Sequence, residues 1–312
     1  MKYSLLTPWL LGAALLTGCD QADEGLLVCE PVAPGVASVA AFHRLFGAPV
    51  QLAEVNSGQT QTVYLLDGST VVVPAGSFML ASGAPVGGTV ELRVQLLNTT
   101  QQMVLSALPS SAFWRPLEAG GHFRITARQG ANALRLRPGR FLTMNMVAPV
   151  NSSPTDQSSW TGIVAGGGGL TTTWAQDTVQ VRPGTNGSGA RTFQTRAWTD
   201  TLGWFSVGRL WTSSPADTTL LRANVDGDAS TRVYLLPTQR SGAFQMKWNS
   251  QTRLMELYGI APNTPLRVVA LRSQSGQLLL STQQVTVRRG LVLRPAFEAV
   301  TPEQAAALIR QP

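Results

Sequence analysis

The stretch Gly88-Thr89-Val90-Glu91-Leu92-Arg93-Val94-Gln95-Leu96 decides the fold class. Because successive side chains of an extended chain point to opposite faces, its apolar residues share one face, while Glu91, Arg93 and Gln95 share the other. This period of two predicts a half-buried β-strand. Similar alternation recurs in residues 122–126 and 133–137, each bounded by glycine or proline.

Turn signals separate further predicted strands. Residues 63–73 read as strand, turn and strand, with Asp67-Gly68 supplying the residue types that adopt the positive φ angles of a two-residue hairpin. In the second half, apolar runs at 230–236, 266–271 and 277–281 predict strands, and Ser275-Gly276 predicts a turn between the last two. The pattern is typical of antiparallel sheets.

The end of the chain carries a helix signal. Thr301 is a good N-cap residue, Pro302 suits the first helical position, and Gln304 stands three residues after the cap. These residues predict a short C-terminal helix over residues 301–312.

Composition bounds the architecture. Of the 312 residues, 44% are hydrophobic and only 13% are charged, which predicts a folded chain with few solvated helices. We therefore expect an all-β fold of two β-sandwich domains, over residues 46–150 and 193–300. Residues 151–192 hold the run Gly166-Gly167-Gly168-Gly169 and much Ser and Thr, so they are interpreted as a flexible linker.

The basic charge comes from arginine. The formal net charge is +7, and Lys2 and Lys247 are the only lysines. Such a balance permits binding to acidic glycans or lipid head groups. The arginines are scattered along the chain, which favours ordinary solvated faces, and nucleic acid is not expected as a partner.

The N-terminus carries a targeting pattern. Lys2 precedes an uncharged apolar stretch from Leu5 to Leu16, which is typical of a secretory signal and shorter than the roughly 20 residues of a spanning helix. The following Leu16-Thr17-Gly18-Cys19 resembles the lipobox of bacterial lipoproteins. The resemblance implies removal of residues 1–18 and a diacylglyceryl thioether on Cys19, with fatty acids such as palmitate anchoring the protein to the inner or outer membrane of the cell envelope.

Residues 19–45 are expected to form an acidic tether, because Asp20, Asp23 and Glu24 follow the lipidated position. With Cys19 modified, Cys29 has no partner within the chain. It is either a free thiol or paired between molecules.

The first predicted sandwich resembles a known fold. Residues 68–78 (GSTVVVPAGSF) and 87–92 (GGTVEL) are similar to the core of the ZU5-like β-sandwich, and residues 103–106 and 117–123 resemble its continuation in envelope lipoproteins. The second half resembles a small immunoglobulin- or transthyretin-type sandwich. The ZU5-like resemblance implies an interaction role and brings no catalytic residues.

Few residues offer chemistry. His43 and His122 are the only imidazoles, and a packed or half-exposed strand position is preferred over a catalytic role for His122. Asn224-Val225-Asp226-Gly227-Asp228 fits a hairpin turn built on Asp-Gly better than an irregular calcium site. An enzyme using carboxylates such as Glu91 and Glu118 is a third-ranked alternative. We expect no cofactor, no metal and no enzymatic activity.

Tryptophan density is the strongest hint of a binding surface, and its members are Trp160, Trp174, Trp198, Trp204 and Trp211. Indoles stack on sugar rings and anchor protein interfaces, but they also fill sandwich cores. The leading hypothesis is a membrane-anchored, non-enzymatic interaction or scaffolding module whose partners are envelope proteins or glycans. The alternative is a glycan-binding lipoprotein that uses this tryptophan cluster.

Overall fold

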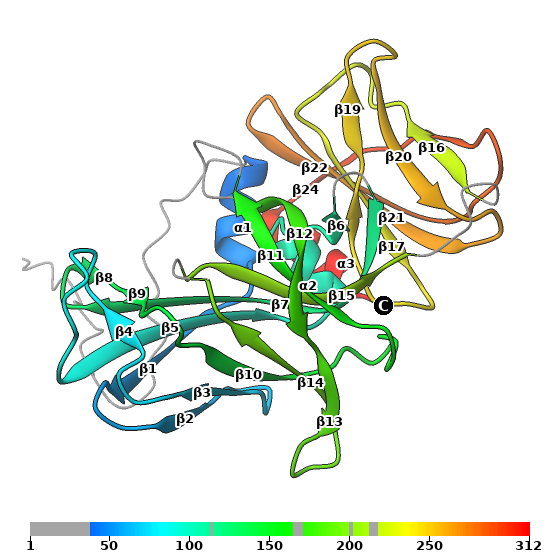
Figure 1. Cartoon of the computed structure of the whole chain (residues 1–312). Helices are drawn as coiled ribbons and strands as arrows, with labels where there is room; N and C mark the ends of the chain where they lie inside the picture. Colours follow the sequence, from blue (N-terminus) through cyan, green and yellow to red (C-terminus); the bar gives the residue numbers. More distant parts are fainter. Residues whose placement is uncertain (1–37, 113–114, 165–170, 200–201, 212–217) are drawn as a thin grey trace, which may run out of the picture.

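The computed structural model describes residues 38–112, 115–164, 171–199, 202–211 and 218–312 (Figure 1). The described helices are α1 (Val39–Phe46), α2 (Thr100–Leu105) and α3 (Pro302–Arg310). The described strands are β1 (Val50–Asn56), β2 (Gln61–Tyr64), β3 (Thr70–Val73), β4 (Phe78–Met79), β5 (Thr89–Leu97), β6 (Ser111–Ala112), β7 (Arg115–Gln129), β8 (Asn132–Ala133), β9 (Arg135–Leu136), β10 (Leu142–Val147), β11 (Ser158–Val164), β12 (Thr171–Gln180), β13 (Arg182–Thr185), β14 (Arg191–Ala197), β15 (Trp204–Leu210), β16 (Thr219–Ala223), β17 (Arg232–Pro237), β18 (Phe244–Gln245), β19 (Lys247–Asn249), β20 (Leu254–Ile260), β21 (Pro265–Gln274), β22 (Gln277–Thr286), β23 (Val292–Leu293) and β24 (Glu298–Val300).

The first sandwich packs two sheets face to face. One sheet runs β1-β5-β7-β15-β11-β12, with β6 and β8 pairing to β7, and the other runs β13-β14-β10-β3-β2. The inward residues of β5, including Val90, Leu92 and Val94, meet those of β3, β10 and β14 in one apolar core. The all-β fold and the half-buried strand at 88–96 are confirmed.

The turn between β2 and β3 differs from the expected two-residue hairpin. Gly68 has a positive φ of 84°, but Asp67 does not, and the loop is wider, with the Leu65 amide donating to the Ser69 carbonyl. The Asp67 carboxylate accepts bonds from the Ser69 backbone and hydroxyl, which fixes this wider turn. As a result Leu66 stands at the tip with 84% of its surface exposed.

The flexible linker expected at 151–192 is wrong. β11, β12 and β13 lie in this range and complete both sheets of the first sandwich, as does β14, which begins at its end. The reason is packing: the indoles of Trp160 and Trp174 and the backbone ladders order a stretch whose own composition looks flexible. The tetraglycine at 166–169 lies outside the described residues.

The domain boundary moves accordingly. β14 and β15 belong to the first sandwich rather than to a second one starting at residue 193. The second sandwich begins at β16 and packs the sheet β19-β20-β16-β23 against the sheet β18-β17-β21-β22-β24. Its turn at Ser275-Gly276 has the expected positive φ angles of 50° and 75°, and Gln274 pairs with Gln277 around it.

A third apolar cluster joins the sandwiches. The three helices lie between the sheet β18-β17-β21-β22-β24 and the β7-β15-β11-β12 end of the first sandwich (Figure 1). We call this cluster the interdomain interface; its buried members include Leu97, Met103, Leu117, Trp160, Trp174, Tyr234, Val269, Leu280 and Ile309. Because β17 contributes to this cluster on one face and to the second core on the other, five of its six residues are buried.

Helices fix the ends of the described chain. The end of the expected tether is instead α1, capped by Ser38 and anchored by buried Phe42. The C-terminal helix is confirmed as α3, with the capping box of Thr301 and Gln304 and with Pro302 in its first turn. Nearly buried Arg267 donates to the carbonyls of Ile309 and Gln311, which closes its C-terminal end. None of the helices in the described part of the chain is long and apolar enough to cross a membrane.

Candidate functional site

The geometry of the interface starts at a bulge in β7. Gly121 pairs with Val207 and Ala119 pairs with Gly208, so Gly120 is an extra residue without a partner in the ladder. Only glycine fits, because a Cβ on Gly120 would lie 2.8 Å from a Val207 methyl carbon and one on Gly121 would lie 2.6 Å from the Met146 sulfur. Because side chains alternate between the two faces of a sheet, the extra residue shifts the alternation by one. The residues of β7 before Gly120 therefore point to the opposite face from the one they would otherwise occupy.

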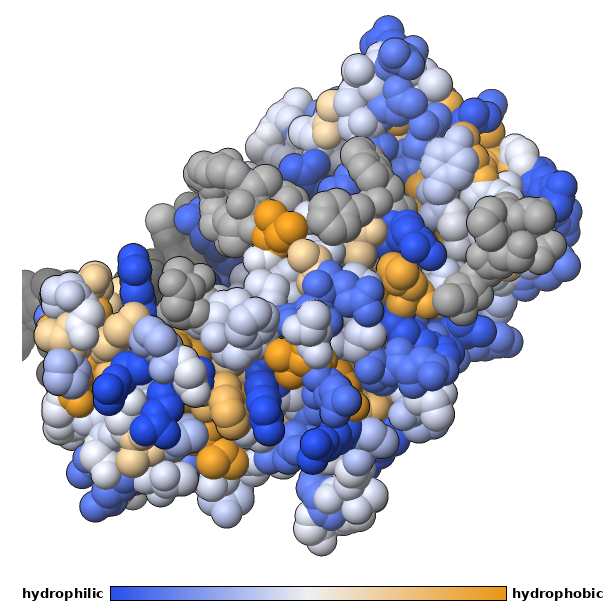
Figure 2. All heavy atoms as spheres, viewed as in Figure 1, coloured by the Kyte–Doolittle hydropathy of each residue, from blue (hydrophilic) through white to orange (hydrophobic). Residues whose placement is uncertain are grey.

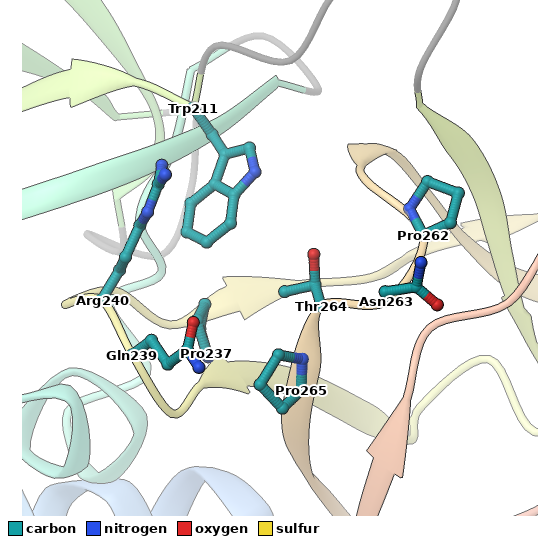
Figure 3. A pocket seen from close by; sticks show the side chains of 8 residues that line it. All are labelled: Trp211, Pro237, Gln239, Arg240, Pro262, Asn263, Thr264 and Pro265. Carbon is teal, nitrogen blue, oxygen red and sulfur yellow. The ribbon is translucent and has the colours of Figure 1, made fainter.

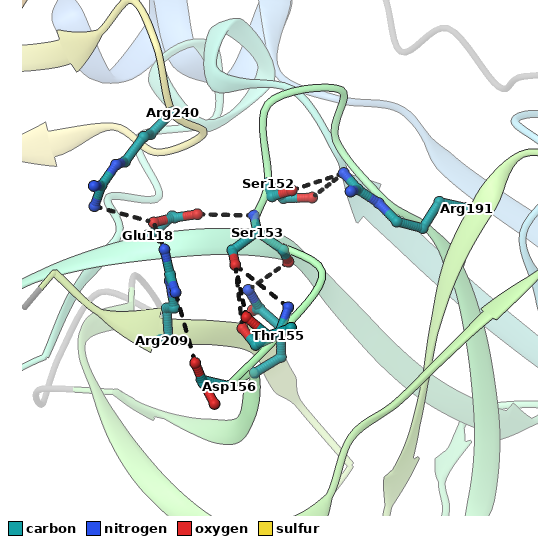
Figure 4. A network of polar contacts seen from close by, with 9 residues as sticks. Glu118, Ser152, Ser153, Thr155, Asp156, Arg191, Arg209 and Arg240 are labelled. Carbon is teal, nitrogen blue, oxygen red and sulfur yellow. Dashed lines mark hydrogen bonds and ion pairs between the residues drawn. The ribbon is translucent and has the colours of Figure 1, made fainter.

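The reversed segment carries a buried carboxylate. Glu118 is 1% exposed and lies directly opposite Arg209 on β15. Nε and Nη2 of Arg209 donate to Glu118 Oε2 at 3.1 and 3.0 Å, and the Ser153 amide donates to Oε1 at 2.8 Å (Figure 4). Arg240, from the second sandwich, places Nη1 3.5 Å from the same Oε2. One carboxylate therefore holds cations from both sandwiches.

Backbone bonds reinforce this contact. The Ser110 amide donates to the Ala243 carbonyl at 2.7 Å, and the Ala119 amide donates to the Ser241 carbonyl at 3.0 Å. The Gly242 amide donates to the Thr100 hydroxyl at 3.3 Å. The loop after β17 is thus bound to the first sandwich by several hydrogen bonds.

We call Glu118, Arg209 and Arg240 the Glu118 cluster. Two shallow pockets flank it. The first, of about 150 Å³, is lined by Trp211 and Arg240 on one wall and by Pro262 and Asn263 on the other (Figure 3). The Arg240 guanidinium lies 4.6 Å from the centre of the Trp211 ring. The second, of about 260 Å³, is lined by Asp156, Ser158, Trp160, Gln176, Arg209 and Leu210. Both are smaller than typical small-molecule sites of roughly 300–1,000 Å³.

The cations in these pockets are already engaged. Arg240 is held by Glu118 and Trp211, and Arg209 is held by Glu118 with Asp156 at 3.9 Å. In Figure 2 hydrophobic side chains on the visible face form separate small patches among polar ones. The pairing of both arginines with Glu118 is suited to joining the sandwiches.

His122 is a buried connector. Its Nε2 lies 3.1 Å from the Ser110 hydroxyl and its Nδ1 lies 2.7 Å from the Ser206 hydroxyl. The ring stacks on Trp174 at 4.6 Å between centroids. Burial lowers the pKa of His122 from 6.5 to about 3, so the imidazole is neutral at physiological pH. The strand position expected for His122 is confirmed, and of the two alternatives it is the packed one.

His43, on α1, is also held by a hydrogen bond. Its Nδ1 lies 3.0 Å from the Leu105 carbonyl oxygen and therefore carries the proton that is donated there. Burial lowers the pKa of His43 to about 4, outweighing the bond to Leu105, and the charge of Arg232 acts in the same direction as burial. Neither imidazole lines one of the two pockets.

The predicted tryptophan cluster does not form one surface. Trp160 and Trp174 are buried in the interdomain interface, where their indole N–H groups donate to the carbonyls of Gly208 and Pro109. Trp211 lies in the second core and Trp204 is half-buried. Trp198, 47% exposed, is the member that presents a large surface to solvent.

The other residues singled out from the sequence lie in a turn or on an accessible strand face. The turn at Asn224–Asp228 forms, with positive φ at Asp226 and Gly227, but it links two sheets rather than a hairpin. No group of three or more potential metal-ligating side chains occurs in the part of the chain that the structure describes. Glu91 pairs with Arg93 on an accessible face. It lies opposite the far end of β7 from Glu118. Cys19 lies outside the described residues.

Sequence reasoning missed the pairing of Glu118 with Arg209 and Arg240. These residues are separated by up to 122 positions, since 240 minus 118 is 122. The available signal was Gly120-Gly121 inside a strand pattern, because glycine within a strand often marks a bulge.

Comparisons with known proteins add no relative. No family model, no curated protein and no solved structure matches this chain. The resemblances to the lipobox, the ZU5-like sandwich and the immunoglobulin or transthyretin type therefore stay predictions.

Proposed function

We propose that this protein is a non-enzymatic interaction or scaffolding module of the bacterial cell envelope, anchored to a membrane through lipid on Cys19. The observation that carries the proposal is the Glu118 cluster, in which one buried carboxylate engages the arginine of each pocket and joins the two sandwiches. A catalytic carboxylate or cation would need to be free to meet a substrate. A rigid pair of sandwiches instead presents outer surfaces at fixed relative positions.

The imidazoles support the same proposal. His122 is fully buried between two serine hydroxyls and His43 is bonded to a helix carbonyl, so both act within the core. A rigid module predicts one cooperative unfolding transition for the whole chain. Calorimetry that resolved two separated transitions, or turnover of peptides, esters or glycans abolished by a single polar substitution, would overturn the proposal.

The membrane anchor rests on the sequence Leu16-Thr17-Gly18-Cys19. The described structure begins at Ser38, 19 residue steps from Cys19 (38 minus 19), a reach of at most about 65 Å for any chain. Radiolabelled palmitate should enter the protein, and Cys19→Ser should move it from the membrane to the soluble fraction. Unchanged partitioning of this variant would remove the anchor.

A glycan-binding role is the second candidate. The buried positions of Trp160, Trp174 and Trp211 remove the expected cluster as its site, whereas the exposure of Trp198 favours a different surface.

A further inference from the structure

The outer face of the sheet β13-β14-β10-β3-β2 carries an ordered row of side chains. In register across the sheet stand Tyr64, Thr70, Asn145, Gln194 and Arg182, one from each strand. Their neighbours along the strands, such as Val71, Met144 and Phe193, point inward to the core. We call the outward side, with Arg196 on β14 and Trp198 at the edge just beyond that strand, the outer face.

The middle of this row is held by hydrogen bonds. Gln194 Nε2 donates to Asn145 Oδ1 at 2.8 Å, and Asn145 Nδ2 donates to the Thr70 hydroxyl at 3.1 Å. Each amide nitrogen has two N–H groups and each amide oxygen two lone pairs, so bonding capacity remains for a ligand. Because the side chains are already oriented, binding costs less conformational entropy.

Aromatic rings stand at opposite corners of the outer face. Tyr64, on the edge strand β2, is 80% exposed. Trp198 lies just after the end of β14, four residues beyond Gln194, and its indole N–H donates to Asp177 on β12, the edge strand of the other sheet. This bond orients the indole while 47% of its surface stays exposed. Large exposed rings of this kind stack on sugars.

The charge on the outer face is positive. Arg182 and Arg196 are exposed there, and the Arg196 guanidinium lies 4.1 Å from the centre of the Phe141 ring, which orients it. Asp177, on the edge strand β12 of the other sheet, already accepts bonds from Trp198, Thr161 and the Thr178 amide. Guanidinium groups bind carboxylates in a planar, paired geometry.

The extent of the face sets the size of the ligand. From β2 to β14 there are three strand spacings of about 4.8 Å, so Tyr64 and Gln194 stand about 14 Å apart. A single sugar cannot contact both, but an extended chain of sugars can.

We propose that the outer face binds an acidic polysaccharide, with Tyr64 and Trp198 stacking on sugar rings, Asn145 and Gln194 bonding hydroxyls, and Arg196 pairing with a carboxylate. This inference names the partner class of the proposed interaction module and so rests on that proposal. It does not depend on the membrane anchor.

The test is a titration of the full chain, purified in detergent, with polygalacturonate and alginate as acidic probes and dextran as the neutral one. Both acidic polymers should bind, and dextran should bind at least about tenfold more weakly. Tyr64→Ala and Trp198→Ala should each weaken acidic-polymer binding about tenfold, the equivalent of roughly 1.4 kcal/mol. Arg196→Gln should weaken it and reduce its dependence on salt.

Matched controls come from the rest of the chain. Tyr258→Ala removes a tyrosine that is 61% exposed on the second sandwich, and Arg135→Gln removes an exposed arginine outside the outer face; neither should change affinity. Absence of binding to both acidic polymers, equal binding of dextran, or equal losses in the control variants would overturn the inference. Membrane partitioning and the single unfolding transition would still report separately on the proposed function.

Discussion

The interdomain interface and the outer face both carry polar and charged side chains, but these side chains are more buried at the interface than on the outer face. At the interface, Glu118 is 1% exposed and is neutralised by Arg209 and Arg240, so its charges contribute to stability. On the outer face, Gln194 and Arg196 are exposed, and they contact Asn145 and Phe141 along the surface of one sheet. The comparison teaches that burial, rather than residue type, decides whether a polar array joins domains or meets a partner.

The largest test of this difference compares two tryptophans. Trp174 is fully buried, stacks on His122 and donates to the Pro109 carbonyl at 2.9 Å. Trp174→Ala should lower the free energy of unfolding by about 4 kcal/mol, because it opens a cavity and leaves that carbonyl without its donor. Urea denaturation measures this loss. The control Trp198→Ala, on the outer face, should cost less than about 1 kcal/mol, and equal losses would contradict the assignment of Trp174 to the core.

Two glutamate–arginine pairs give the next comparison. Glu118→Ala removes the charge-assisted bonds from Arg209 and leaves the Ser153 amide without its acceptor, which should lower the free energy of unfolding by about 2–3 kcal/mol. Glu91→Ala breaks the pair with Arg93, whose side chains are each 39% exposed, and should cost no more than about 0.5 kcal/mol. Chemical denaturation of both variants checks the ratio. Similar losses would mean that Glu118 does not join the sandwiches.

Acid should weaken the core. The pKa of His122 is about 3 in the folded chain against 6.5 when unfolded, so the unfolded state takes up the proton first as pH falls. Stability is therefore complete above about pH 7 and is lost as pH falls through 6.5 toward 3. For His122 the loss between pH 7 and pH 5 is about 2 kcal/mol, and His43 acts in the same direction.

Denaturation at the two pH values measures this slope. A His122→Asn variant should be less stable at pH 7 but should lose less stability on acidification than the parent chain. An unchanged slope would exclude His122 as its source.

The smallest effect is expected on the outer face. Gln194→Ala removes one bond to Asn145 from an exposed row and should change the free energy of unfolding by less than about 0.5 kcal/mol. Thermal unfolding checks this expectation. A loss comparable to that of Glu118→Ala would make the outer face a structural array and erase the contrast with the interface.

The sequence predicted the strands that alternate clearly and the helix that has strong caps. β5, the β21–β22 turn at Ser275-Gly276 and α3 follow from residue pattern alone. Residues 151–192 were misassigned because their glycine, serine and threonine content hides strands that are ordered by neighbours distant in the chain. The wider turn at Asp67 escaped prediction because a side-chain bond to Ser69 sets its geometry.

For the sites, sequence pattern identified residues but not their exposure. It singled out five tryptophans, yet only the packing of two sandwiches around α1, α2 and α3 places Trp160 and Trp174 inside and leaves Trp198 outside. Local pattern determined the all-β class because the period of two is a property of each strand by itself. The tertiary structure decided which charges meet, since the extra residue at Gly120 turns Glu118 toward arginines that no local pattern connects to it.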